Sequence, residues 1–278
     1  SETAFSDIIS IKIAKQHNIS TALIQHGLID ESDKNYEFIK FAKQFPVYCD
    51  KFIVWGKEHQ RYAIRRGFPS EKIEIIGSPI HETIFDTKLN SNLTNDYILL
   101  ATSSPVDNNT NDLLVRTNEN YELAIEKICK TVVKMNKKLV IKLHPSQTEL
   151  DITELVKKID PSIIVIKNYD IVSLMKSCEA FVVIDVSTTI LEAQILEKPV
   201  ISVTVKEDLS NNSEVYNSNS CTRCSIDNFE ISLNLILNNM DYSKKQIENG
   251  NAFVNQYLSN QKNASKKLLS FLERFSIN

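Results

Sequence analysis

Residues 180–205 read AFVVIDVSTTILEAQILEKPVISVTV. The apolar run Ala180–Ile184 predicts a buried strand. Thr189–Leu196 predicts a helix that stops before Pro199, because the residue before a proline disfavours helix. Val200–Val205 is a second apolar run. Strands that are apolar at nearly every position are typical of parallel sheets covered on both faces. The segment therefore indicates a strand-helix-strand unit of a parallel α/β fold.

The same alternation of strand and helix extends outward from this segment. Further strands are predicted at Thr21–Gln25, Lys51–Trp55, Lys72–Ile76, Tyr97–Ala101, Lys138–Leu143 and Ile163–Ile166, and helices include Thr3–His17, Tyr36–Lys43 and Asn118–Met135. A polar, asparagine-rich stretch at 86–95 reads as a linker. We expect two Rossmann-like parallel-sheet modules, at 1–85 and 96–227, with C-terminal helices at 228–278 packing across both.

The composition restricts the function classes. The chain has 278 residues, enough for about two domains. Its net charge of -3 gives no reason to expect a nucleic-acid partner. The five cysteines are odd in number and scattered, which indicates reduced thiols in the cytoplasm. Cys221 and Cys224 have no second cysteine pair, so free thiols are favoured over a zinc site with four ligands.

Ligands of parallel α/β sheets bind at the carboxyl ends of the strands. Five candidate loops follow predicted strands: His26-Gly27, Gly77-Ser78-Pro79, Thr102-Ser103-Ser104, His144-Pro145 and Asp185–Thr189. Lys142 alternates with Leu143 along its strand, so we expect its side chain in solvent.

The loop before residue 190 has two interpretations. Thr189 and Glu192 have the spacing of a capping box, in which the threonine caps the helix and the glutamate reaches back. Alternatively, the hydroxyls of Ser187, Thr188 and Thr189, with the N–H groups of the helix start, bind a phosphate. The spacing alone favours the cap.

The histidines are ambiguous in the same way. His144, fixed by Pro145, is placed to donate a hydrogen bond to a phosphate. His26, beside Gly27, is placed to act as a general acid or base, because the ordinary pKa of histidine lies near neutral pH. Taken alone, each is better explained as a loop histidine. No role is assigned to the other three, His17, His59 and His81.

Three segments together resemble the GT-B enzymes of bacterial and archaeal surface-polysaccharide synthesis. They are KFIVWGKEHQRYAIRRGFPSEKIEIIGSPIHETIF at Lys51–Phe85, IKLHP at Ile141–Pro145, and YDIVSLMKSCEAFVVIDVSTTILEAQILEKPVISV at Tyr169–Val203. They resemble, in turn, a junction ending in Gly-Ser-Pro, a His-Pro motif, and a Ser-Ser/Thr motif with its Lys-Pro-Val strand. The pattern is similar to CDP-glycerol glycerophosphotransferases, polysialyltransferase-like capsule enzymes and, more distantly, UDP-N-acetylglucosamine 2-epimerases.

The resemblance implies a GT-B fold and a transferase that moves a sugar or sugar-like group from a nucleotide-activated donor to a growing surface glycan. It implies donor-phosphate binding by the residues His144, Pro145, Ser187, Thr188 and Thr189, with Glu192 near the ribose and His26 as the catalytic acceptor-side histidine. The strand-end loops at Gly77, Ser78 and Ser103 complete the expected donor site. The sequence has no DxD pattern, so we expect neither a metal nor a cofactor besides the donor.

Two departures and two alternatives qualify this hypothesis. Leu28-Ile29-Asp30 stands where the glycerophosphotransferases have Thr-Pro-Leu-Lys, which argues against CDP-glycerol as donor and against His26 as the base. Thr102–Val106 stands where the epimerases have His-Arg-Arg-Glu-Asn, which makes UDP-sugar 2-epimerase activity a second choice. A non-catalytic nucleotide-sugar-binding module is the other alternative.

The first module has about three predicted strands, and three parallel strands leave an apolar edge open. Because the chain starts at Ser1 and not at Met, we favour missing upstream strands over a homodimer in which a second copy covers the edge. A chain cut in this way would bind donor without turning it over. The C-terminal helices carry apolar residues among lysines. Packing on the first domain is favoured over contact with the inner face of a membrane.

Overall fold

The computed structural model describes residues 5–28, 48–65, 67–87, 97–103, 111–145, 150–205 and 213–275. The predicted helix Tyr36–Lys43 and most of the predicted linker at 86–95 lie outside these residues. The chain divides into two compact units, one of residues 1–89 with 252–278 and one of residues 90–251. The segment 228–278 is thus shared between the units. Among the described helices, none is both long enough and apolar enough to cross a membrane.

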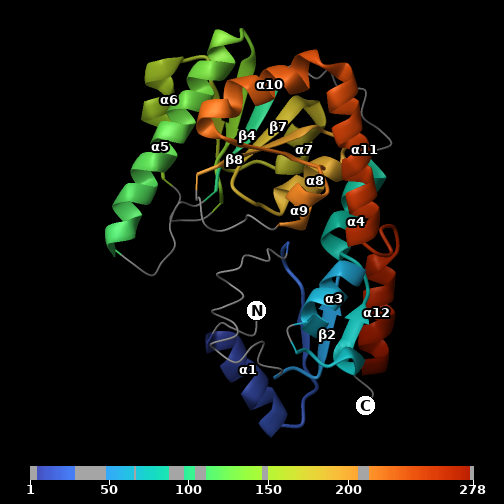
Figure 1. Ribbon diagram of the computed structural model, residues 1–278. Coiled ribbons are helices and arrows are strands. Elements are labelled where there is room, and N and C mark those ends of the chain that lie inside the picture. The colour runs from blue at the N-terminus through green and yellow to red at the C-terminus, as the bar shows by residue number, and fades with distance from the viewer. Residues whose placement is uncertain are drawn as a thin grey trace. The chain divides into compact units, whose positions relative to one another are not determined.

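The second unit is built on a six-stranded sheet in which all neighbouring strands are parallel (Figure 1). The strands are β4 (Tyr97–Ala101), β5 (Lys138–Lys142), β6 (Ile164–Ile166), β7 (Cys178–Ile184), β8 (Val200–Thr204) and β9 (Thr222–Ser225), in the order β6-β5-β4-β7-β8-β9. The first five were predicted, and β9 was missed. This is the strand order of a doubly wound fold, whose direction of winding reverses between β4 and β7. The predicted parallel α/β fold is confirmed.

Helices cover both faces of this sheet. They are α5 (Asn111–Lys134), α6 (Thr153–Ile159), α7 (Ile171–Ser177), α8 (Thr189–Ile195), α9 (Glu214–Asn217), α10 (Phe229–Asn238) and most of α11 (Met240–Tyr257). The helix α5 packs on β5 and α10 packs on β7 and β8, whereas α7 and α8 pack together and against β4, β7 and β8. The covering of both faces explains why β7 and β8 are apolar along nearly their whole length.

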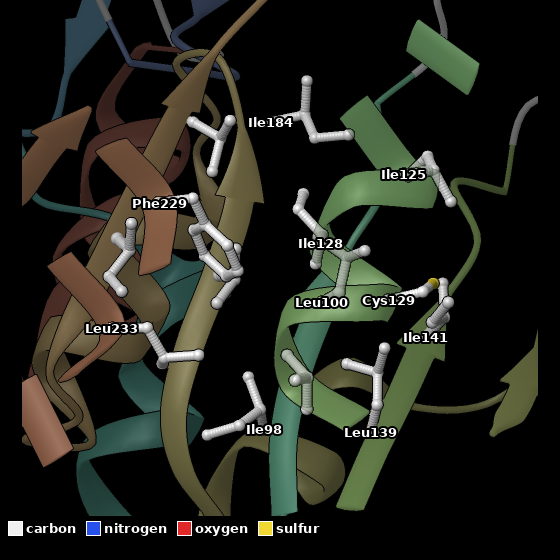
Figure 2. Packing of buried hydrophobic residues seen from close by; sticks show 14 of the residues in the cluster. Ile98, Leu100, Ile125, Ile128, Cys129, Leu139, Ile141, Ile184, Phe229 and Leu233 are labelled. Atoms are coloured by element: carbon white, nitrogen blue, oxygen red, sulfur yellow. The ribbon is translucent and has the colours of Figure 1, made fainter. Parts of the chain in front are cut away.

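The main core lies between α5, α10 and one face of the sheet (Figure 2). Alternate residues of β4 and β5, including Ile98, Leu100 and Ile141, point to this side. Ile128 of α5 and Phe229 of α10 belong to the same core, and both are fully buried. This packing fixes the strands, and therefore the loops that follow their carboxyl ends.

The first unit has a smaller parallel sheet in the order β1-β2-β3. Its elements are α1 (Phe5–Gln16), β1 (Ala22–Ile24), β2 (Lys51–Val54), α3 (Lys57–Arg65), β3 (Ile73–Ile75), α4 (Pro79–Thr87) and α12 (Ala264–Phe275). Three strands were predicted, and three lie in the described residues. That strands are missing upstream stays a prediction.

The Gly-Ser-Pro junction leads directly into a helix. The helix α4 begins directly at Pro79, because a proline is well suited to the first position of a helix. His81 therefore lies in a helix, where it is buried. Gly77 has a φ of +101°, a conformation that favours glycine, and a side chain there would collide with the carbonyl oxygen of Ser259.

Candidate functional site

A cavity of about 560 Å³ opens at the carboxyl ends of β4, β5, β6 and β7. Its lining comprises Ala101, Thr102, Lys142, Leu143, His144, Pro145, Lys167, Asn168, Tyr169, Asp170, Ile171, Ser187, Thr188, Thr189 and Glu192. Six predicted donor-binding residues are thus brought together: His144, Pro145, Ser187, Thr188, Thr189 and Glu192. The cavity lies where β4 has β5 on one side and β7 on the other, so the loops diverge and leave a crevice.

The turn between β7 and α8 begins at Asp185, which has a φ of +59°. Its carboxylate oxygen Oδ1 accepts a hydrogen bond from the backbone N–H of Val205, at 2.8 Å. The hydroxyl of Ser187 then accepts hydrogen bonds from the N–H of Thr189, at 3.3 Å, and from its hydroxyl, at 2.9 Å. These bonds hold three hydroxyl-bearing residues, Ser187–Thr189, against the cavity.

The predicted capping box is wrong. The residue before α8 is Thr188, whose φ of -58° and ψ of -26° are helical, and its side chain makes no capping hydrogen bond. Capping by a side chain needs an extended N-cap residue, so Thr189 and Glu192 cannot form the reciprocal pair. The helix α8 has only seven residues. The groups that the turn offers to an anion are therefore the hydroxyls.

Glu192 is released from capping and lies in the cavity wall. Its carboxylate oxygen Oε2 is buried and has no hydrogen-bond partner among the described residues. Burial, and then the charge of Asp170, raise the pKa of Glu192 to about 7. Near neutral pH this carboxyl is therefore partly protonated, and its protonated form can donate a hydrogen bond to a ligand.

Asp170 lies at the start of α7 and keeps its charge. Its carboxylate accepts hydrogen bonds from the backbone N–H groups of Val172, at 3.3 Å, and Ser173, at 2.8 Å. Burial acts to raise the pKa of Asp170, but hydrogen bonds from Ser173 and Val172 outweigh it and hold that pKa below its ordinary value. The negative charge next to Glu192 is thus fixed by a helix cap.

Lys142 was wrongly expected in solvent. Its side chain is 6% exposed, and its ammonium group donates a hydrogen bond to the carbonyl oxygen of Leu143, at 2.7 Å. Both faces of a doubly wound sheet are covered, so the alternation along β5 does not lead to water. The long side chain instead brings its charge to the cavity at the strand end.

His144 follows Lys142 at the same strand end. Its backbone N–H donates a hydrogen bond to the hydroxyl of Thr102, at 2.9 Å, which ties the loop after β5 to the end of β4. Partial burial, and then the positive charge of Lys142, lower the pKa of His144. The imidazole is therefore neutral at physiological pH, and Lys142 carries the positive charge.

The other predicted site residues lie elsewhere. Ser103 does not line the cavity, and its N–H donates a hydrogen bond to the hydroxyl of Tyr121, at 3.0 Å. Gly77 and Ser78 belong to the first unit. The hydroxyl of Ser78 is 2.6 Å from His81 Nδ1, and its residue is 3% exposed. These contacts give Gly77 and Ser78 a role in their own unit.

His26 is exposed and follows β1 in the first unit. The neighbouring Gln25 is buried and donates a hydrogen bond to the carbonyl oxygen of Gly27, at 2.8 Å. Its own side-chain oxygen accepts a hydrogen bond from the N–H of Trp55, at 2.9 Å. The turn that carries His26 is thus held from within its unit.

Sequence reasoning missed several residues of the cavity wall. Lys142 was expected in solvent, and in the loop after β4 Ser103 was chosen where Thr102 lines the cavity. The segment Lys167–Ile171 after β6 was given no role in the site. The rule that ligands bind at the carboxyl ends of strands could have found this segment, because it directly follows a predicted strand. Asp170 also precedes Ser173 by three residues, which is the spacing of an N-cap.

The fold is similar to that of several solved structures. The S. aureus MnaA-UDP co-structure has a TM-score of 0.67 at 15% identity, over 99% of this chain and 73% of that chain. The UDP-GlcNAc 2-epimerase from Neisseria meningitidis bound to UDP-GlcNAc has a TM-score of 0.65 at 14% identity, over 98% and 74% of the two chains. The pneumococcal O-GlcNAc transferase GtfA in complex with UDP and GlcNAc has a TM-score of 0.52 at 14% identity, over 96% and 54%. At such identities the similarity establishes a GT-B-like fold.

Among curated proteins, none matches the sequence. The family model of the LIC12162 family transferases matches residues 2–219, which is more than half of the chain. This match also favours a transferase over an epimerase. The chain belongs to the LIC12162 family of transferases.

Proposed function

We propose that the chain binds a nucleotide-activated sugar, or a sugar-like group, in the cavity of the second unit and transfers that group to a growing surface glycan. One observation carries the proposal. Lys142, His144 and the hydroxyls of Ser187–Thr189 line one cavity at the point where the sheet reverses its winding. A cation, a neutral imidazole and hydroxyls are the groups that recognise a diphosphate.

The leaving nucleoside diphosphate develops negative charge as its bond to the sugar breaks. The ammonium of Lys142, the imidazole of His144 and the hydroxyls of Ser187 and Thr188 stabilise this charge. Removal of one such donor lowers the rate by roughly 100- to 1000-fold in other enzymes. A lysine supplies positive charge in this mechanism, and the proposed transfer uses no metal. His26, in the first unit, deprotonates the acceptor.

Glu192 binds the donor beside its phosphates. Its buried, unpartnered oxygen Oε2 needs a hydrogen-bonding partner, and a ribose hydroxyl provides one. Three of the similar solved structures contain UDP, UDP-GlcNAc, or UDP together with GlcNAc, and this supports a UDP-sugar as the donor. The acceptor is a surface glycan, and the enzyme works in the cytoplasm.

Calorimetry tests the donor site. Wild-type chain is titrated with UDP, CDP and CMP, and the tightest ligand is then titrated into His144→Ala. Binding to this variant should fall below detection, because the variant loses a phosphate-binding imidazole. His17→Ala is the control, since His17 is exposed and belongs to the first unit. Equal affinity in wild type and His144→Ala would refute the assignment.

Product analysis tests the reaction. The chain is incubated with UDP-, CDP- and CMP-sugars, with and without glycan acceptors, and free nucleotide is measured. Nucleotide release that requires an acceptor supports the transferase. Interconversion of the sugars without an acceptor supports the epimerase instead, and binding without any turnover supports a non-catalytic module.

A further inference from the structure

A second cavity, of about 640 Å³, lies beside β9, the edge strand of the six-stranded sheet. It is formed by the ends of β8 and β9 and by the beginning of α10. Its lining residues are Thr204, Arg223, Cys224, Ser225, Asn228 and Ser232. Arg223 is the single charged residue among them. The other five carry a hydroxyl, an amide or a thiol group, and none carries a carboxylate. No part of the proposed donor site includes these residues.

Arg223 is held in a fixed orientation. Its Nε–H donates a hydrogen bond to the hydroxyl of Thr204, at 3.1 Å, and its guanidinium lies over the ring of Tyr216, 5.0 Å from the centroid. The hydroxyl of Tyr216 is in turn 2.7 Å from that of Ser202, which is fully buried. A guanidinium that is ordered before a ligand arrives loses less conformational entropy on binding.

The same network reaches the turn of the donor cavity. The hydroxyl of Ser202 donates a hydrogen bond to the backbone carbonyl of Asp185, at 2.9 Å. Asp185 is the residue that begins the turn carrying Ser187 and Thr188. Both cavities therefore lie at the carboxyl ends of the strands of one sheet. A cation–π contact from Arg223 to Tyr216 and two hydrogen bonds through Ser202 link them within one unit.

The described residues that line the second cavity offer one cation and several hydrogen-bond donors, which are groups that bind anions. The hydroxyls of Ser225 and Ser232 and the amide of Asn228 can each donate a hydrogen bond. The acidic residue adjacent in sequence, Asp227, is paired with Lys127 at 2.8 Å. Burial raises the pKa of the Cys224 thiol, which keeps it neutral.

We propose that the Arg223 cavity is a binding site for an oxyanion, a phosphate or carboxylate group on the acceptor. The assignment to the acceptor rests on the proposed transferase function, whereas the binding of an oxyanion does not. The donor cavity holds the nucleotide diphosphate, and the Arg223 cavity holds a charged group of the second substrate at the same sheet edge. An acidic glycan is the class of acceptor that this charge selects.

Nuclear magnetic resonance of the full chain tests the site through the Arg223 Nε–H signal. Inorganic phosphate and glucuronate are titrated separately, with glucose as the neutral control and UDP as the donor-site probe. Arg274 is the internal reference, because its Nε–H also donates to an oxygen, the carbonyl of Ser270, at 3.1 Å. We expect saturable shifts of the Arg223 signal with phosphate or glucuronate, and none with glucose.

Two variants complete the test. Arg223→Gln should weaken phosphate or glucuronate binding at least tenfold, measured on the amides of Ser225 and Asn228, and UDP should still shift the amides of Thr188 and Thr189. Arg223→Lys should retain part of the affinity and confirms that folding is not the cause. If Arg223 responds to the anions no more than Arg274 does, the site is refuted. If UDP alone shifts Arg223, the acceptor assignment is overturned. Absence of UDP shifts at Thr188 and Thr189 counts against the donor site only.

Discussion

Substitution of Glu192 by glutamine should stabilise the second unit in a pH-dependent manner. In the unfolded chain the pKa of this carboxyl is 4.5, and burial in the folded chain raises it to about 7. Below the lower value both states are protonated, and ionisation has no effect on folding. Between the two values the unfolded chain loses its proton first, so the free energy of unfolding falls as the pH rises. Above pH 7 the loss is complete.

The size of the effect follows from the shift. One pKa unit corresponds to about 1.4 kcal/mol, so the rise from 4.5 to about 7 destabilises the folded chain by about 3 kcal/mol at alkaline pH. Glutamine has a similar shape and no charge to bury. The stability gained by Glu192→Gln should therefore increase by about 2 to 3 kcal/mol between about pH 5 and about pH 8.

Urea unfolding of wild type and Glu192→Gln at both pH values measures this difference. Glu154→Gln is the control, because Glu154 is exposed on α6 and its carboxylate lies in water in both states. Its effect on stability should be small at both pH values. A Glu192→Gln effect that is equal at the two pH values would refute the reasoning, because it would show that Glu192 ionises as easily in the folded chain as in the unfolded one.

Three further predictions concern other buried groups. Lys142→Met should weaken UDP binding by about 10- to 100-fold in calorimetry. The reason is the loss of a hydrogen bond to a charged group, which is worth about 1.5–3 kcal/mol. Unchanged affinity would exclude Lys142 from the donor site. Gly77→Ala should lower the free energy of unfolding of the first unit by more than about 1 kcal/mol in urea unfolding. The φ of Gly77 is +101°, and the carbonyl of Ser259 occupies the space that a side chain would need. Burial lowers the pKa values of His59 and His81 to about 3 and about 4, so the first unit should lose stability as the pH falls from 6.5 toward 4. His81→Gln should reduce that loss, which thermal unfolding monitored by circular dichroism measures.

The strands of the second unit could be predicted because they are apolar almost throughout. In β7 the run Ala180–Ile184 is entirely apolar, and in β8 Ser202 is the single polar residue before Thr204. The strand β9 was missed for the opposite reason. Its sequence, Thr222-Arg-Cys-Ser225, is short and mostly polar, as an edge strand can be because one side of it carries no further strand. Pairing with β8 creates this strand, and local sequence does not reveal that pairing.

The cavity of the candidate donor site could be predicted as a set of loops but not as a set of interactions. The spacing of Thr189 and Glu192 fits a capping box, yet the turn from Asp185 to Thr188 brings the chain into the helix already in a helical conformation. Similarly, strand alternation placed Lys142 opposite Leu143 but could not show that helices close off both faces. In both cases the tertiary environment decides what a local pattern does.

These two errors concern the residues that control the charge of the cavity. Lys142 lies in the cavity wall as a buried cation, His144 is neutral beside it, and burial raises the pKa of Glu192 to about 7. The negative charges of a diphosphate disfavour a further carboxylate, so a bound donor raises the pKa of Glu192 above its value in the empty site. Binding of the proposed donor should therefore be coupled to uptake of a proton by Glu192. Departure of the nucleotide should release that proton, and Asp170 and the ionised fraction of Glu192 should then repel the diphosphate product.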